Sequence, residues 1–231
     1  MELDFGTALA ELGPSLLDGV GIVVYITIAG FLSSLVVALV LAIGRLSRSR
    51  ILNGVLITVI EVIRGTPLLV QFFYLYYVVP MLISGIAGLF GIGITVQIAA
   101  STCGIIGFAI NYGCYLSEVI RAAILAIDPG QREAGLALGF GESQVLFRFV
   151  IPPALRNSVP VFGNYLVMMI KDTSLLAMIS VQELLLRTRT FASQTFLTVE
   201  AYTILALVYL AISIPLSQVA KLLERRLSQS R

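Results

Sequence analysis

The chain has 231 residues, of which 58% are hydrophobic and 12% charged, and its mean hydropathy is +0.98. A soluble domain carries roughly twice that charge, so the composition excludes an ordinary water-soluble protein and indicates an integral membrane protein. The sequence has no histidine, which excludes imidazole metal sites and histidine-based acid–base catalysis. Its net charge of +2 is spread over several loops, so a nucleic-acid-binding surface is not expected.

Five apolar stretches are long enough to cross a bilayer. A hydrocarbon core about 30 Å thick needs roughly 20 helical residues. The runs with little or no charge predict transmembrane helices at about Val20–Ile43, Thr66–Ile83, Thr95–Leu116, Val159–Ile179 and Ala201–Ala220. The glycine-rich segment Ser84–Gly93 is expected to form the turn between the second and third of them. The predicted fold is therefore all-α and polytopic, with residues 1–231 forming one transmembrane domain.

Basic residues orient this arrangement, because lysine and arginine near span ends accumulate on the cytoplasmic side. They follow the first span, separate the third from the fourth, and follow the fifth: Arg45, Arg48, Arg50, Arg121, Arg132, Arg148, Arg156, Lys221, Arg225, Arg226 and Arg231. With five spans, these three segments share one side. The N-terminus is thus predicted to lie outside and the C-terminus inside, with residues 118–157 forming a cytoplasmic loop.

Catalytic chemistry finds little support along the chain. The two lysines, Lys171 and Lys221, do not follow a GxxxxG pattern, so no phosphate-binding P-loop is predicted. Cys103 and Cys114 are eleven residues apart in an apolar span, and we interpret them as packing residues.

The loop between the third and fourth spans has the signals of a short helix. Asp128 is placed to cap its start and Pro129 occupies the first helical position. The helix is expected to run to Leu138, after which Gly139 takes the left-handed conformation that ends helices. Small residues on this helix, Ala134, Gly135 and Ala137, allow another surface to approach closely.

A second short helix is predicted to begin near Glu142. It places one apolar stripe on its surface, formed by Val145, Leu146, Phe149 and Val150, and Pro152-Pro153 is expected to stop it. The charges between Asp128 and Arg156 balance, which favours a protein groove over anionic lipid as the docking partner. An ordinary amphipathic connector is the alternative.

One spacing in this loop is specific. Glu133-Ala134-Gly135 is followed by Gly139, and then by Phe149, Ile151 and Pro152. This pattern resembles the EAA motif of the membrane-spanning permease subunits of ATP-binding-cassette importers, in the polar amino acid branch that serves histidine-, glutamine- and arginine-type solutes. Gly135, Phe149 and Ile151 depart from the motif conservatively. Further segments resemble the same branch in the same order: Glu61–Gln71, Cys114–Ile124, Asp128–Gly139 and Lys171–Ile179.

The resemblance implies partners and a mechanism. Two permease subunits, identical or related, pair in the cytoplasmic membrane of a bacterium, and an extracytoplasmic binding protein delivers the amino acid. A dimer of P-loop ATPases binds ATP and magnesium, so this chain itself is expected to hold no cofactor and to catalyse no reaction. The residues implied to couple it to the ATPase are Glu133, Ala134, Gly135 and Gly139.

Charged residues within the spans are candidates for the solute pathway, because such groups usually face a protein interior or cavity. Lys171 and Asp172 are adjacent, and adjacent helical residues point about 100° apart, so a direct bridge between them is poorly placed. By the resemblance, Asp172 meets the α-ammonium group of the substrate. Neighbouring candidates are Asn164, Tyr165 and Thr173. A purely structural role for Lys171 and Asp172 is the alternative.

Arg64 is a second candidate, since a guanidinium can hold a carboxylate through two hydrogen bonds. A bridge to Glu61 or Glu118, or a simple anchor at the span end, is the alternative. The similar permeases for basic amino acids tend to carry a second acid along the face of Asp172. Tyr165 supplies none here, so the resemblance argues mildly against an arginine-type substrate.

Two other functions stay open. One is a self-contained secondary transporter or channel that uses Lys171 and Asp172 as an ion site. The other is a non-transporting subunit that anchors cytoplasmic enzymes to the membrane.

Overall fold

The computed structural model describes residues 3–228, and within this range the chain is almost entirely helical with no strand. The elements in order are α1 (Phe5–Gly44), α2 (Arg50–Arg64), α3 (Leu68–Phe73), η1 (Tyr74–Val78), α4 (Val79–Leu89), α5 (Ala100–Leu125), α6 (Pro129–Ala137), α7 (Glu142–Val145), η2 (Leu146–Val150), α8 (Ile151–Asp172), η3 (Thr173–Ile179), α9 (Leu184–Thr195) and α10 (Thr198–Ser228). Four helices are long and apolar enough to cross a membrane, or five if the bent pair Glu142–Ile179 and Leu184–Thr195 is one span. The predicted all-α polytopic fold is confirmed.

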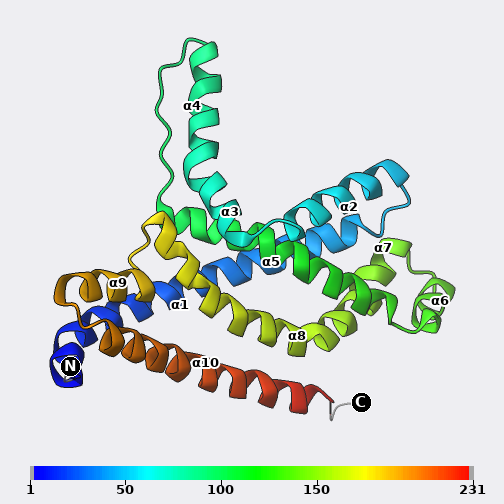
Figure 1. Cartoon of the computed structure of the whole chain (residues 1–231). Helices are drawn as coiled ribbons and strands as arrows, with labels where there is room; N and C mark the ends of the chain where they lie inside the picture. Colours follow the sequence, from blue (N-terminus) through cyan, green and yellow to red (C-terminus); the bar gives the residue numbers. More distant parts are fainter. Residues whose placement is uncertain (1–2, 229–231) are drawn as a thin grey trace.

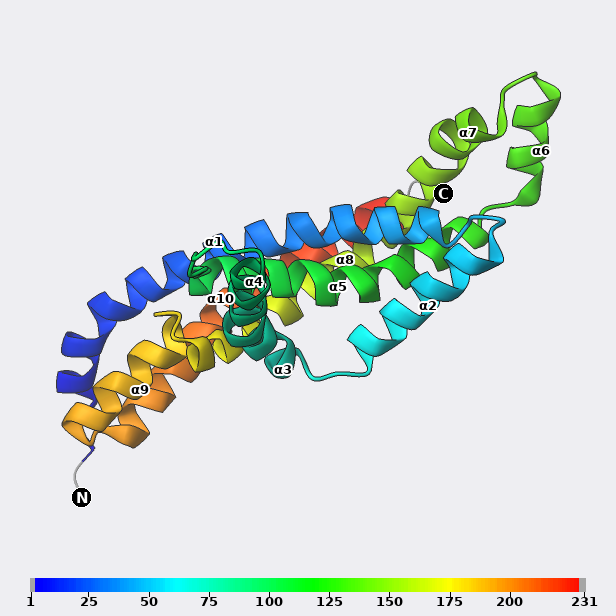
Figure 2. The same ribbon diagram turned by 90° about the horizontal axis from the view of Figure 1, so that it is seen from above.

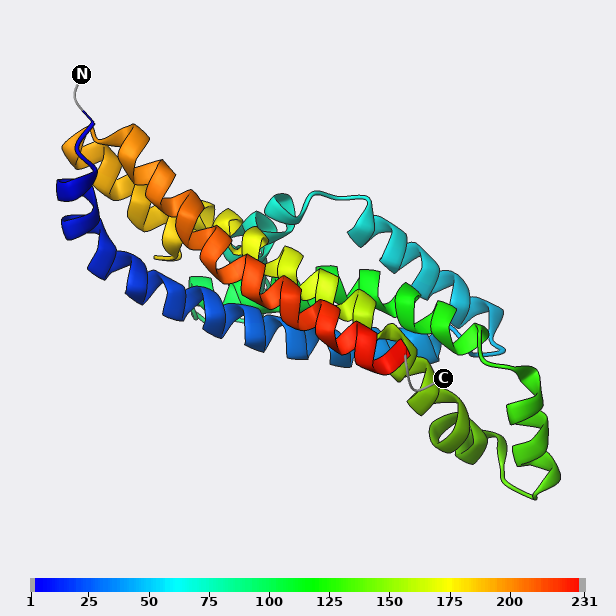
Figure 3. The same ribbon diagram turned by 90° about the horizontal axis from the view of Figure 1, so that it is seen from below.

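The long helices α1, α5, α8 and α10 run lengthwise through the molecule (Figure 1). The start of α1 and helix α9 lie at one end, whereas α6, α7 and the end of α10 lie at the other (Figures 2 and 3). The first residue of α1 follows Asp4, whose carboxylate accepts a 2.9 Å hydrogen bond from the Thr7 amide and so caps the helix.

Small side chains bring α1 and α5 together. Gly30 packs on Phe108 and Gly113 packs on Val37, while Ala38 is fully buried at the same interface. Small residues allow close backbone approach between membrane helices, where lipid offers no hydrophobic driving force for association. The α1–α5 pair is thus the most extensive helix contact among the described residues, and α8 packs against both of its helices.

The predicted second span differs most from the structure. Helix α4 continues to Leu89 through Gly85 and Gly88, so the expected turn at Ser84–Gly93 is wrong in its first half. The chain reverses instead at Gly91, whose φ of +73° is one that glycine adopts readily. Figure 1 shows α4 projecting across the direction of the long helices, with the strand-like return to α5 beside it. The spacing of apolar residues and the charges in the sequence carry no information on the direction in which α4 projects.

The other predicted spans are correct in place but not in length. Helix α1 begins at Phe5, well before the expected start, and α5 runs from Ala100 to Leu125. The predicted first residues of the third span, from Thr95, are extended chain. The helix Arg50–Arg64 was not predicted as a separate element, although it packs along α5.

The prediction that Pro152-Pro153 ends the second loop helix is wrong. Residues Glu142–Ile179 form one continuous helical run, in which a π-helical turn, η2, precedes the two prolines. Pro152 and Pro153 directly follow the first residue of α8, inside this run, where they lack the amide hydrogens that a helix interior uses. The wider i→i+5 turn, in which the Ile151 amide bonds to the Leu146 carbonyl, accommodates them.

Candidate functional site

Two breaks in helical structure border the same cavity. One is the segment Gly65–Pro67 between α2 and α3, and the other is the change from α-helix to 3₁₀-helix at Asp172. The cavity has a volume of about 430 Å³ and is lined by Arg64, Gly65, Thr66, Pro67, Leu68, Asn111, Tyr112, Tyr115, Tyr165, Met168 and Asp172. Discontinuous helices that meet in this way form the substrate sites of many transporters, because unwound backbone is tolerated in a membrane only where it lines a cavity.

The acidic side of this cavity is Asp172. Its carboxylate accepts a 2.6 Å hydrogen bond from the hydroxyl of Tyr112. The buried Tyr112 ring is packed edge-to-face against Phe108 and Tyr165, at centroid distances of 5.8 and 6.0 Å, so its hydroxyl is well fixed. Lys171 is exposed and does not line the cavity, and no ion pair joins it to Asp172 in residues 3–228, as their offset on the helix predicts.

The basic side is Arg64. Its guanidinium lies over the ring of Tyr115, with Cζ 5.1 Å from the ring centroid, and its Nη1 is 3.6 Å from Oε1 of the exposed Glu61. Within the described residues, its buried Nε has no hydrogen-bond partner. The alternative bridge from Arg64 to Glu61 is therefore present but long, and it leaves guanidinium donors available to a ligand.

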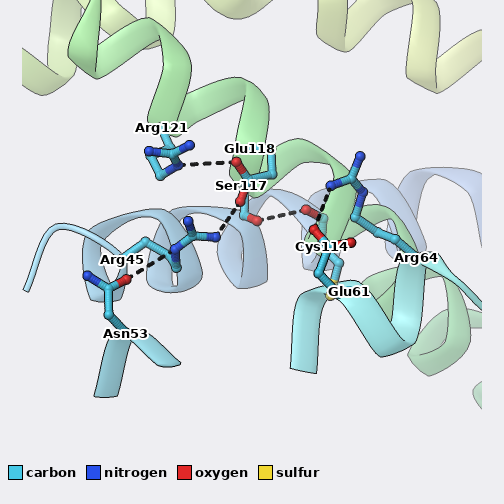
Figure 4. Close-up of polar contacts among 8 residues, drawn as sticks. All are labelled: Arg45, Asn53, Glu61, Arg64, Cys114, Ser117, Glu118 and Arg121. Atoms are coloured by element: carbon cyan, nitrogen blue, oxygen red, sulfur yellow. Dashed lines mark hydrogen bonds and ion pairs between the residues drawn. The ribbon is translucent and has the colours of Figure 1, made fainter. Parts of the chain in front are cut away.

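Glu118, the other partner weighed for Arg64, is engaged elsewhere. Its two oxygens bind Arg45 at 2.6 Å and Arg121 at 3.1 Å, as Figure 4 shows. Asn53 accepts a further bond from Arg45, so this network ties the turn after α1 to α5. It stands apart from the cavity lining.

The remaining candidates divide between cavity and surroundings. Tyr165 lines the cavity, whereas Asn164 is exposed and outside its lining. Thr173 is fully buried, and its hydroxyl donates to the Ile170 carbonyl at 2.6 Å. Sequence reasoning did not select the lining residues Asn111, Tyr112 and Tyr115. The sequence feature that could have indicated these three residues is the polar cluster "NYGCY" (residues 111–115) inside an otherwise apolar span.

A second region of interest is α6 and its corner, which extend beyond the end of the long helices (Figure 2). Asp128 caps α6 through a 2.7 Å bond from the Gly130 amide, and Gly139 has φ of +86°, as predicted. Glu133 and Ala134 are exposed. Gly135, in contrast, is buried, and a Cβ on it would lie 2.9 Å from Val145, so its small size serves packing within the chain.

Glu142, at the start of α7, forms two ion pairs beside α6. One of its carboxylate oxygens binds Arg48 at 3.2 Å and Arg132 at 3.1 Å. All three side chains are more than half exposed, so these pairs contribute modestly to stability. Through the shared Glu142 oxygen they connect α6 to the turn after α1.

Comparison with known proteins decides the family. A family model described as "Binding-protein-dependent transport system inner membrane component" matches residues 21–229. The chain belongs to this family. The resemblance to importer permeases that rests on the EAA-type motif is confirmed.

The permease is similar over nearly its full length to transport system permease proteins whose names specify an amino acid. It is 35% identical to the glutamine transport system permease protein of Escherichia coli K12, over 93% of each chain. It is also 35% identical to the L-cystine transport system permease protein of Bacillus subtilis, over 94% of this chain and 88% of that one.

A solved structure supports the architecture of the permease. The crystal structure of an amino acid ABC transporter with histidines has a chain that superposes with a TM-score of 0.82 at 31% identity, covering 98% of this chain and all of that one. A chain of the MetNI methionine ABC transporter superposes with a TM-score of 0.62 at 14% identity, which shows a shared fold alone. The permease is thus a polytopic inner-membrane component of a binding-protein-dependent transport system.

Proposed function

We propose that this permease imports a polar amino acid with no net side-chain charge, and that the solute passes through the cavity between the two helix breaks. The observation that carries the proposal is the pairing of Arg64 and Asp172 in one cavity lining. A guanidinium suits an α-carboxylate and a carboxylate suits an α-ammonium group, so the cavity is matched to the charges of an amino acid.

The rest of the lining favours an uncharged side chain. Once Arg64 and Asp172 face the two backbone charges, the remaining polar groups of the lining side chains are the hydroxyls of Thr66, Tyr112, Tyr115 and Tyr165 and the amide of Asn111. Such groups exchange neutral hydrogen bonds with an amide or hydroxyl. The name of one relative, for glutamine, agrees with this class, and the cystine named for the other has a side chain with no net charge. L-Glutamine is therefore the first solute to test.

The energy source in this proposal is a separate ATPase dimer, which binds the ATP and magnesium. The exposed Glu133 and Ala134 on the projecting helix α6 support a docking role, with Gly139 forming the corner and Gly135 holding α6 against η2. A second permease subunit and an extracytoplasmic binding protein complete the assembly. We place the N-terminus outside and the α6 end in the cytoplasm of a bacterium, because the basic residues gather at that end.

Reconstitution tests the proposal. The permease is co-expressed with the P-loop ATPase and solute-binding protein from its own genome, and the complex is placed in proteoliposomes with a panel of amino acids. We expect uptake that requires ATP, and ATP hydrolysis stimulated most by neutral polar members of the panel. Uptake driven by an ion gradient without any ATPase would support the secondary transporter instead, and no uptake of any amino acid would support the membrane anchor.

A further inference from the structure

One side chain, that of Gln71 in α3, holds the break between α2 and α3 together. Its Nε2 donates to the Ile63 carbonyl at 2.7 Å, to the Thr66 carbonyl at 3.1 Å and to the Thr66 hydroxyl at 2.9 Å. Its Oε1 accepts a 3.1 Å bond from Nδ2 of Asn111 on α5. Both ends of the amide are thus engaged, and they connect three elements.

The chain needs this donor for a local reason. In a continuing helix, the Ile63 carbonyl would accept from the amide of residue 67, but Pro67 has no amide hydrogen. The Thr66 amide reaches that carbonyl only at 3.4 Å, and the Thr66 hydroxyl, which is shared with the Val62 carbonyl, reaches it at 3.2 Å. An under-satisfied carbonyl inside a membrane protein is unfavourable, and the amide of Gln71 supplies the stronger hydrogen bond.

The two residues that Gln71 holds lie on either side of Arg64. Ile63 directly precedes Arg64, and Thr66 follows it by two positions. Arg64 is also held directly, because the hydroxyl of Tyr115 donates to its carbonyl at 3.2 Å and the Tyr115 ring supports its guanidinium. The backbone of Arg64 is therefore fixed from both sides, while its side chain keeps a buried Nε without a partner among the described residues.

We propose that Gln71, anchored by Asn111, is a positioning residue that fixes the guanidinium of Arg64 at the cavity for the α-carboxylate of the substrate. Gln71 is not part of the cavity lining and does not touch the substrate; it acts through the backbone of residues 63–66. This inference rests on the proposed function, since it assigns a role in recognition of the same solute. It predicts a defect that is larger for the α-carboxylate than for the rest of that solute.

The test compares L-glutamine with its α-amide, which lacks the α-carboxylate, as solutes for the reconstituted complex. Gln71→Met keeps the side-chain length and removes every hydrogen bond. We expect its KM for L-glutamine to rise about tenfold, the equivalent of about 1.4 kcal/mol, with kcat changed less than about twofold. Its KM for the α-amide should rise clearly less, because that solute makes no ionic contact with Arg64; a smaller rise shared by both solutes would come from the lining residue Asn111, which loses its partner.

Matched variants make the result specific. Gln97→Met changes an exposed glutamine of the segment before α5 and should leave both KM values as in wild type. Arg64→Gln should raise the KM for L-glutamine at least as much as Gln71→Met, and the double variant should be no worse than Arg64→Gln, because the two act as one unit. Gln71→Asn, whose amide is too short to reach both carbonyls, provides a second variant if the methionine variant is poorly assembled.

Two results would overturn the inference while leaving the proposed function intact. These are an equal rise in KM for the acid and the α-amide, or additive effects of Gln71→Met and Arg64→Gln. Failure of the wild-type complex to take up any amino acid would instead overturn the proposed function, and this inference with it.

Discussion

Replacement of Gly113 by alanine tests the close packing of α1 against α5. A Cβ at Gly113 would lie 2.6 Å from Cγ1 and 2.8 Å from Cβ of Val37, and 3.4 Å from the Ser34 carbonyl. The Cβ of Val37 is fixed to its backbone, so no rotamer change relieves the contact. Real Cβ contacts are essentially never shorter than 3.0 Å and ordinary van der Waals contact begins at 3.4 Å, so the two helices have to separate locally by about 0.2–0.6 Å.

Two opposing effects set the size of the change. Overpacking of a well-packed interface typically destabilises by about 1–3 kcal/mol, and replacing glycine by alanine inside a helix stabilises by about 0.5–1 kcal/mol. The net destabilisation is between about 0 and 2.5 kcal/mol, with a central value of about 1 kcal/mol. For a chain of this size, each kcal/mol shifts the Tm by about 2–4 °C, so we expect Gly113→Ala to lower the Tm by several degrees.

Thermal unfolding in detergent, followed by circular dichroism, measures this effect. Gly21→Ala on α1 is the matched control, because no atom lies within 4 Å of the added methyl group, and its Tm should be unchanged or slightly higher. Adding Val37→Ala to Gly113→Ala should recover only part of the loss, because it removes Cγ1 at 2.6 Å but keeps the Cβ at 2.8 Å. A Tm for Gly113→Ala equal to or above that of Gly21→Ala would refute the reasoning.

Three further changes probe the proposed site, the docking helix and a buried cap. Asp172→Asn should reduce uptake at least tenfold in proteoliposomes while the complex still assembles, since it removes the charge that faces the ammonium group; retained uptake would remove Asp172 from the pathway. Glu133→Arg should abolish co-purification with the ATPase without changing the Tm, because this side chain is exposed; full co-purification would contradict docking through α6. Glu183→Gln should lower the free energy of unfolding by about 1–3 kcal/mol and with it the Tm. The reason is that the buried carboxylate accepts 2.8 and 2.7 Å bonds from the Leu185 and Leu186 amides and one from the Tyr209 hydroxyl. An unchanged Tm would show that the cap is dispensable.

The ends of helix α6 and the charged residues of the cavity were predictable from the sequence. The start of α6 at Pro129 and the left-handed Gly139 follow from capping preferences that operate within a few residues. Likewise, Arg64 and Asp172 were identified because ionisable groups are rare in apolar spans. Both line the same cavity, although their sequence separation gave no reason to place them together.

Features set by tertiary packing were not predictable. The hydrogen bond from Tyr112 to Asp172 depends on how α5 and α8 cross, and the direction of α4 depends on contacts that periodicity does not encode. The prolines after η2 were misinterpreted for another reason: a π-helical turn has no reliable sequence signal, yet it lets a helix continue through Pro152-Pro153.

The continuous helical run from Glu142 through Asp172 has a mechanical consequence. At 1.5 Å per residue it is a rod about 45 Å long, with the α6 corner at one end and the carboxylate that borders the cavity at the other. A helical rod that is pushed at one end tilts as a whole, whereas a flexible linker would bend. A displacement of about 3 Å at the corner therefore tilts the rod by about 4° over this length. Pro160 and the π-turn are the two places along it where such a load would bend it. Stiffening η2 is therefore a way to change how far motion at the α6 end reaches Asp172 without altering either end.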